Sequence, residues 1–379
     1  MHGHSPRLGI TQPNAECRKG AMGSLVNAIT ALKGRRVLVT GDTGFKGSWL
    51  ALWLHLAGAE VFGYALPAES ENSHFTSLGL EKLIDHQDGD VRDVDHLKRF
   101  MQSSQPEIVF HLAAQALVRR SYLDPKTTYD TNIGGAVNLM EAVKTTESIR
   151  SLVFATSDKC YKNKEVLNGY RETDELGGRD PYSASKAAAE LIFASFFESF
   201  LSTRANFGAA TVRAGNVIGG GDWAQDRIIP DCIRALSTSR PILLRYPNAT
   251  RPWQHVLEPL SGYIQLAHFL LEAPSKFKGA WTFGPAESNA FSVHDVAKRA
   301  IAIWGSGDIQ IDSDNPQMHE ATLLHVNCEK ARNELGWQTK WDFLQTMSMT
   351  VSWYRDVNHG ENVRAMSESQ ITSYMETTK

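Results

Sequence analysis

Tyr182 and Lys186 lie four positions apart in the segment PYSASK, so a helix there places a phenol and an ammonium group one turn apart on the same face. Lowering the pKa of a tyrosine from about 10 to neutrality requires roughly 4 kcal/mol of preferential phenolate stabilisation. A nearby lysine and a second positive charge could supply it. Although YxxxK alone is common and usually lies on a surface, its position after a strand favours a tyrosine base.

Three further reactive side chains, Ser157, Asp158 and Lys159, follow one another directly after the apolar run 152–155. If that run is a strand, a hydroxyl, a carboxyl and an amine emerge at the carboxyl edge of a parallel sheet, where open α/β folds bind ligands. The alternative is a Ser/Asp cap beside a solvated lysine. The YxxxK pair favours the reactive cluster.

A glycine-rich turn, TGDTGFKG, joins the apolar run 36–40 to a segment with helical spacing of tryptophan and leucine. Glycines allow the backbone to approach a pyrophosphate, and the N-terminus of the following helix offers N–H groups and partial positive charge. The alternative is simply a tight turn. Its position at the start of a βαβ unit predicts a dinucleotide site formed by Gly41, Thr43, Gly44, Phe45 and Gly47.

The choice of dinucleotide depends on the residues at the end of the second expected strand. That strand ends with Tyr64-Ala65-Leu66 and lacks the acidic residue that normally binds the ribose hydroxyls of NAD. No lysine or arginine lies between Lys46 and Lys82 to bind a 2′-phosphate, so NAD is favoured over NADP. Asp90, followed by Val91, could bind the adenine amino group; a turn or helix-cap role is equally compatible with the sequence.

Short apolar runs alternate with helical patterns from residue 34 to about 213, which predicts an α/β fold with a doubly wound, Rossmann-type parallel sheet. The pattern then loosens and prolines become frequent. We therefore expect a NAD-binding domain at 34–212 and a smaller C-terminal substrate-binding domain at 213–357, with an approximate and possibly discontinuous boundary. Residues 1–33 and 358–379 are expected to be polar tails.

Composition excludes several function classes. The 379 residues carry a formal net charge of -3, with 42% hydrophobic and 21% charged residues, which does not suggest a nucleic-acid-binding protein. No apolar stretch is long enough for a membrane span, and no secretory signal is evident. Four widely spaced cysteines suggest free thiols rather than a metal site. These features predict a cytoplasmic protein without a metal.

Several motifs in order resemble the extended short-chain dehydrogenase/reductase family over residues 34–350, and within it the nucleotide-sugar 4,6-dehydratases. The motifs are TGDTGFKGSWL, HLAAQALVRRSY, TSDKCYKN, GGRDPYSASKAAAE, RAGNVIGGGDW and RPWQHVLEPLSGY. TSDKCY together with GFKGSWL most resembles the branch that acts on CDP-glucose.

This resemblance implies a dehydration in which Tyr182 takes the proton of the sugar 4-hydroxyl while hydride passes from C4 to NAD and later returns to C6. Ser157 would bind the same oxygen, and Lys186 would hold the cofactor ribose and tune Tyr182. Asp158 would protonate the departing 6-hydroxyl, and Lys159 would remove the C5 proton. A lysine is almost fully protonated at neutral pH, so Lys159 could instead only orient the sugar.

The resemblance also implies that Asn216, Arg227 and Arg251 contact the nucleotide or diphosphate of the substrate, although structural salt bridges are an alternative for the arginines. It implies a homodimer or homotetramer. The leading hypothesis is NAD-dependent dehydration of CDP-glucose. Another nucleotide-sugar dehydratase, a 4-epimerase and a non-catalytic nucleotide-binding scaffold are the alternatives; Asp158 and Lys159 favour elimination because an epimerase needs neither.

Overall fold

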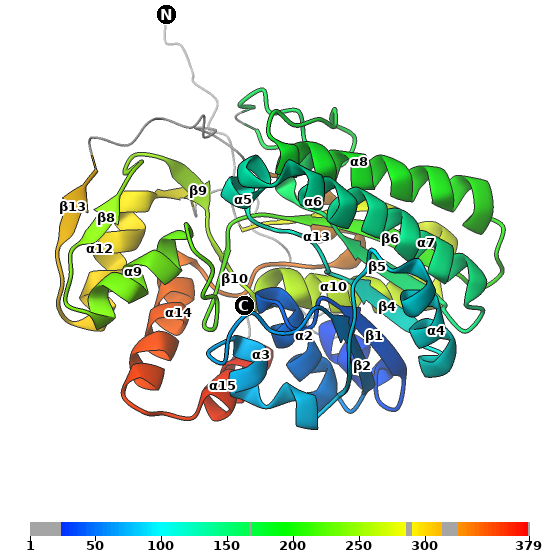
Figure 1. Ribbon diagram of the computed structural model, residues 1–379, viewed down its shortest axis with the longest axis horizontal. Helices are drawn as coiled ribbons and strands as arrows, with labels where there is room; N and C mark the ends of the chain where they lie inside the picture. The colour runs from blue at the N-terminus through cyan, green and yellow to red at the C-terminus, as the bar shows by residue number, and fades with distance from the viewer. Residues whose placement is uncertain (1–23, 167, 286–289, 313–324, 378–379) are drawn as a thin grey trace, which may run out of the picture.

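The computed structural model describes residues 24–166, 168–285, 290–312 and 325–377. Its centre is a seven-stranded sheet in the order β11-β6-β5-β4-β1-β2-β3, in which every pairing is parallel (Figure 1). The strands are β1 (Arg36–Thr40), β2 (Glu60–Ala65), β3 (Asp85–Asp88), β4 (Ile108–His111), β5 (Ser151–Ala155), β6 (Gly208–Ala214) and β11 (Gly279–Phe283). The strand order reverses between β1 and β4, which confirms the predicted doubly wound architecture and places a ligand crevice at that point.

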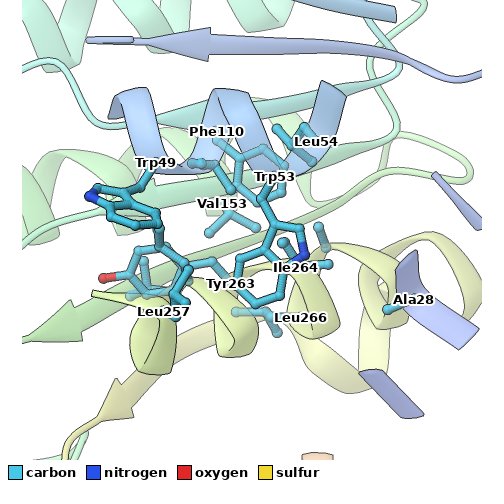
Figure 2. Close-up of a cluster of buried hydrophobic side chains, with 14 of the residues drawn as sticks. Ala28, Trp49, Trp53, Leu54, Phe110, Val153, Leu257, Tyr263, Ile264 and Leu266 are labelled. Atoms are coloured by element: carbon cyan, nitrogen blue, oxygen red, sulfur yellow. The ribbon is translucent and has the colours of Figure 1, made fainter. Parts of the chain in front are cut away.

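Helices cover both faces of the sheet. On one face α2 (Phe45–Leu56) packs with α10 (Leu257–Glu272), and on the other lie α4 (Val94–Ser104), α7 (Gly135–Thr145) and α8 (Pro181–Phe196). Figure 2 shows Trp49 and Trp53 of α2 between the sheet and the α10 side chains Tyr263 and Ile264. Each fully buried large apolar side chain contributes about 1.5–3 kcal/mol to folding, so this contact fixes α2, and with it the glycine turn, against the sheet.

Part of the C-terminal half forms a smaller lobe beside the sheet, at the left of Figure 1. The lobe contains α9 (Ile228–Ser237), α12 (Val293–Trp304) and α14 (Phe343–Asn358), the strand pair β8 (Ile242–Leu244) and β13 (Ile309–Ile311), and the pair β9 (Thr250–Pro252) and β12 (Ala290–Ser292). However, α10 and β11 come from the same half of the chain and belong to the main sheet layers. The two parts are therefore interleaved in sequence.

Shorter elements connect these layers. They are α3 (His74–Leu78), α5 (Val118–Leu123), α6 (Pro125–Tyr129), α11 (Pro274–Phe277), α13 (Glu329–Leu335), the strand pair β7 (Val217–Ile218) and β10 (Gln254–His255), and the short turns of helix η1 (Leu80–Lys82), η2 (Asp130–Gly134), η3 (Asp158–Cys160) and η4 (Phe197–Leu201). Within the described ranges, no helix is both long and apolar enough to cross a bilayer.

The expectation of a polar tail at 358–379 is wrong for most of that segment, because α15 (Val363–Glu376) is a packed helix. Its buried positions Ser367, Gln370, Ile371 and Tyr374 follow helical spacing, but two are polar, which weakened the apolar pattern. Part of the expected tail at 1–33 is also helical, over residues 24–31, and buries Leu25 and Ala28. Residues 1–23 lie outside the described residues.

Candidate active site

The glycine turn is shaped by close approaches that other residues would not permit. Gly41 has a φ of +78°, and a Cβ there would lie 2.7 Å from the backbone nitrogen of Ala113. A Cβ on Gly47 would lie 2.0 Å from the carbonyl oxygen of Gly41. The helix α2 starts at Phe45, and no side chain caps its N-terminus. The turn therefore combines close backbone approaches at its glycines with a helix N-terminus that no side chain caps, which suits a dinucleotide pyrophosphate.

Thr43 and Gly44 complete this turn on its outer side. The Thr43 hydroxyl donates to the carbonyl of Leu66 at 2.9 Å, which ties the turn to the end of β2. Gly44 is the N-cap residue of α2 and is exposed. The five residues expected at the cofactor thus lie in the turn and in the first turn of helix α2.

Asp90 and Val91 lie beyond the end of β3. The Asp90 carboxylate accepts hydrogen bonds from the backbone and guanidinium nitrogens of Arg92, which hold its pKa below the ordinary value. Val91 is buried, and a surface hollow lined by Asp90, Arg92, Asp93 and Val94 opens next to it. The local turn role expected for Asp90 is present, and its adenine contact stays a prediction.

Helix α8 brings the tyrosine and lysine to the end of β5. It begins at Pro181 with Asp180 as N-cap, and both Tyr182 and Lys186 are buried. Tyr182 shares a side-chain hydrogen bond with Ser157, and the Lys186 Nζ lies 3.5 Å from the carbonyl oxygen of Ala155. The hydroxyl, phenol and amine predicted from distant parts of the sequence are therefore neighbours.

Asp158 and Lys159 extend this cluster within η3. The Ser157 hydroxyl donates to Asp158 Oδ1 at 3.0 Å, and the Lys159 backbone N–H donates to Ser157 Oγ at 3.2 Å. Asp158 is 3% exposed, and a Cβ on Gly215 would lie 1.7 Å from its Oδ2. The glycine after β6 thus makes room for a buried carboxylate beside Tyr182, while Lys159 is only partly buried.

The protein alone does not activate the tyrosine. Burial, followed by the charges of Asp158 and Asp180, raises the pKa of Tyr182 to about 12, although the hydrogen bond with Ser157 opposes this shift. Burial, followed by the positive charge of Lys46, lowers the pKa of Lys186 to about 8. A further positive charge close to the phenol, such as that of a bound ligand, would lower the pKa of Tyr182 from this value.

Sequence analysis singled out the glycines of the turn and missed Lys46 between them. Burial, followed by the positive charge of Arg227, lowers the pKa of Lys46 to about 8, while the charges of Asp158 and Asp222 oppose the shift. The Lys46 ammonium group therefore lies close enough to Asp158 to interact with its charge. The signal available in the sequence was a lysine in the turn that begins α2, on a helix otherwise rich in apolar residues.

The residues expected at the nucleotide end of a substrate are spread over the smaller lobe and its junction with the sheet. Asn216 lies between β6 and β7 with a left-handed φ of +51°. The Arg227 guanidinium is 2.9 Å from Asp222 Oδ2, so the predicted alternative of a structural salt bridge is present. Arg251 is 8% exposed on β9, and its guanidinium donates to the carbonyl of Thr250 at 2.8 Å.

A doubly wound sheet with a glycine turn at its switch point and a Ser157, Tyr182 and Lys186 cluster at the end of β5 defines an extended short-chain dehydrogenase/reductase. The family model for GDP-mannose 4,6 dehydratase matches residues 38–350, and the chain belongs to that family. A protein of Salmonella typhimurium named CDP-glucose 4,6-dehydratase is 45% identical over 351 residues, which cover 91% of this chain and 98% of the Salmonella protein.

Epimerases are more distant relatives. A UDP-glucose 4-epimerase of Lacticaseibacillus casei is 26% identical over 341 residues, which cover 86% of this chain and 98% of that protein. The crystal structure of a UDP-glucose 4-epimerase from Brucella ovis in complex with NAD has a TM-score of 0.73 and 21% identity, and covers 85% of this chain and 99% of that chain. This structural likeness supports the fold.

Proposed function

We propose that this protein converts CDP-glucose into CDP-4-dehydro-6-deoxyglucose and water, with NAD as a cofactor that returns to its oxidised form. The observation that carries the proposal is the buried carboxylate of Asp158 beside Ser157 and Tyr182, because a 4-epimerase needs no acid at C6. The 45% identity to the Salmonella CDP-glucose 4,6-dehydratase supports the choice of sugar nucleotide. The enzyme is a hydro-lyase.

The glycine turn fits NAD because its cradle has room only for glycine at two positions and the N-terminus of α2 is uncapped. Gly41, Thr43, Gly44, Phe45 and Gly47 would hold the pyrophosphate. Asp90 and Val91 would contact the adenine, and Lys186 the nicotinamide ribose. When bound, NAD supplies an acceptor for the hydride of sugar C4 and later returns that hydride to C6.

In the first half of the reaction, Tyr182 removes the proton of the sugar 4-hydroxyl. Its pKa of about 12 in the protein alone must fall, and the positive charges of the oxidised nicotinamide and of Lys186 both favour the phenolate. Ser157 donates a hydrogen bond to the same sugar oxygen. The product of this half is a 4-ketone, which makes the C5 proton acidic.

In the second half, Lys159 accepts the C5 proton and Asp158 donates a proton to the departing 6-hydroxyl, so that water leaves and a C5–C6 double bond forms. This step requires that the buried Asp158 carboxyl carry the proton it donates when the sugar is bound. The alternative role of Lys159 is to orient the sugar. The C5 position is reprotonated as the C6 position is reduced.

We also assign residues 34–212 to the cofactor and 213–357 mainly to the nucleotide sugar, with Asn216, Arg227 and Arg251 at the nucleotide end. A homodimer or homotetramer is the proposed assembly. We propose a cytoplasmic location, which agrees with the buried free thiols of Cys160, Cys232 and Cys328.

The test is incubation of the purified protein and NAD with CDP-, dTDP-, GDP- and UDP-glucose, followed by mass spectrometry. Loss of one water from CDP-glucose, with the C4 hydrogen recovered at C6, is the expected result. Preferred dehydration of another nucleotide sugar would reassign the substrate. Formation of CDP-galactose would indicate an epimerase, and no turnover on any sugar would favour a binding scaffold.

A further inference from the structure

The adenosine end of the cofactor site lacks its usual acid, and this inference about it rests on the proposed use of NAD. Strand β2 ends at Ala65, and Leu66 follows. A carboxylate at this place normally accepts hydrogen bonds from the ribose hydroxyls of NAD. The side chains of Ala65 and Leu66 cannot accept these hydrogen bonds. If a carboxylate binds the ribose hydroxyls, it must therefore come from a neighbouring element.

The neighbouring strand carries a carboxylate at the matching position. Ala65 of β2 pairs in register with Asp88, the last residue of β3. Residues paired in register on parallel strands point to the same face of the sheet, about 4.8 Å apart. The Asp88 side chain is 61% exposed and therefore accessible to a ligand. Asp88 thus lies one strand spacing from the position of the missing acid.

A chain of hydrogen bonds connects Asp88 to the glycine turn. Its Oδ1 is 3.2 Å from the Nε2 of His86, and the Nδ1 of His86 is 2.7 Å from Oδ2 of Asp42, the third residue of the turn. Asp42 is fully buried, and Gly63 of β2 leaves the space for its carboxylate, since a Cβ there would lie 2.1 Å from Asp42 Oδ2. The imidazole of His86 therefore orients Asp88 relative to the turn.

The charges around Asp88 also discriminate between dinucleotides. A carboxylate accepts hydrogen bonds from ribose hydroxyls but repels a 2′-phosphate. Arg92, the nearest following cation in the sequence, is paired with Asp90. We propose that Asp88, oriented by His86, takes the place of the acid at the end of β2, binds the adenosine ribose hydroxyls of NAD and selects NAD over NADP.

The test is Asp88→Asn, with the dissociation constants for NAD and NADP measured by calorimetric titration of the full-length protein. Because a hydrogen bond to a charged acceptor is roughly twice as strong as a neutral one, we expect NAD to bind about 5-fold or more weakly. NADP should bind equally well or better, so the preference for NAD falls at least about 5-fold. Asp85→Asn, at the opposite end of β3, is the matched control and should change neither constant.

His86→Gln tests the orienting role and should reduce the preference for NAD in the same direction but by less. Unchanged constants for both dinucleotides in Asp88→Asn would overturn the inference, and so would equal weakening of both. These results require a wild-type protein that binds NAD. A wild type that fails to bind it would overturn the proposed function along with this inference, so the two failures are distinguishable.

Discussion

Arg213 of β6 and Glu190 of α8 form an ion pair of 2.9 Å in which both side chains are at most 5% exposed. Glu190 lies on the helix that carries Tyr182 and Lys186, one turn beyond the lysine. Its carboxylate also accepts a hydrogen bond from the hydroxyl of Thr156, the residue before Ser157. Glu190 therefore connects the helix that carries the tyrosine both to β6 and to the strand end that carries the serine.

Glu190→Gln is expected to destabilise the protein by about 3–5 kcal/mol, because it leaves the guanidinium of Arg213 buried without a compensating charge. Chemical denaturation followed by tryptophan fluorescence measures this loss. The matched control is Glu198→Gln, which removes a carboxylate that is 65% exposed and 3.4 Å from Lys278. The control should change stability by no more than about 1 kcal/mol. If Glu190→Gln lowered the free energy of unfolding by no more than this control, the buried pair would not be needed for stability.

The sequence alone predicted the parts of the site that depend on local spacing. Tyr182 and Lys186 are one helical turn apart, and the glycine turn lies between a strand and a helix that are adjacent in the chain. The alternation of strands and helices then placed Ser157 at the same sheet edge as these elements. These inferences needed only the spacing of residues along a helix, the conformational preference of glycine in turns, and the rule that open parallel sheets bind ligands at the carboxyl ends of their strands.

The parts that sequence analysis missed depend on contacts between distant segments. Asp42 and His86 are 44 residues apart and meet only because β2 and β3 pair in one register, with Gly63 between them. The pairing of Arg213 with Glu190 likewise depends on how α8 crosses the sheet. A polar residue in a single sequence does not reveal which distant partner will satisfy it. Helix α15 was missed because buried polar residues interrupt its apolar face.

Tyr182→Phe should abolish oxidation at C4 while the fold is kept. The buried phenol has one side-chain hydrogen bond, to Ser157, so its removal leaves the packing intact. Loss of a general base typically costs about 100-fold to 10,000-fold in rate. The transient rise of NADH absorbance in a single turnover, recorded by stopped-flow mixing of enzyme, NAD and CDP-glucose, measures the step. Tyr129→Phe, on an exposed tyrosine, is the control with wild-type rate. Normal NADH formation by Tyr182→Phe would assign the base to another residue.

Asp158→Asn should separate the two halves of the reaction. The amide keeps the size of the side chain over Gly215 but cannot donate a proton to the 6-hydroxyl as a carboxylic acid does. We expect NADH and a 4-keto sugar that retains its 6-hydroxyl to accumulate. Rapid quenching and mass spectrometry of the sugar nucleotide distinguish this species from the final product. An equal loss of oxidation and elimination would contradict the assigned role.

The Asp42, His86 and Asp88 chain should make stability fall with pH above neutrality. Burial alone would lower the pKa of His86, but its hydrogen bond with Asp42 and the charges of both carboxylates outweigh burial and raise it. The folded state therefore binds more protons than the unfolded state just above pH 6.5. The stabilisation is complete below the unfolded pKa and is lost as the pH rises through the folded pKa.

His86→Gln removes this titration, so the difference in unfolding free energy between the wild type and the variant should shrink from pH 6 to pH 9. Urea denaturation at several pH values measures the difference. His359→Gln replaces an exposed histidine at the end of α14 and should follow the wild-type profile throughout. A difference that stays constant over this range would mean that the two carboxylate contacts of His86 do not shift its pKa between the folded and unfolded states, because only unequal proton binding by the imidazole makes the difference depend on pH.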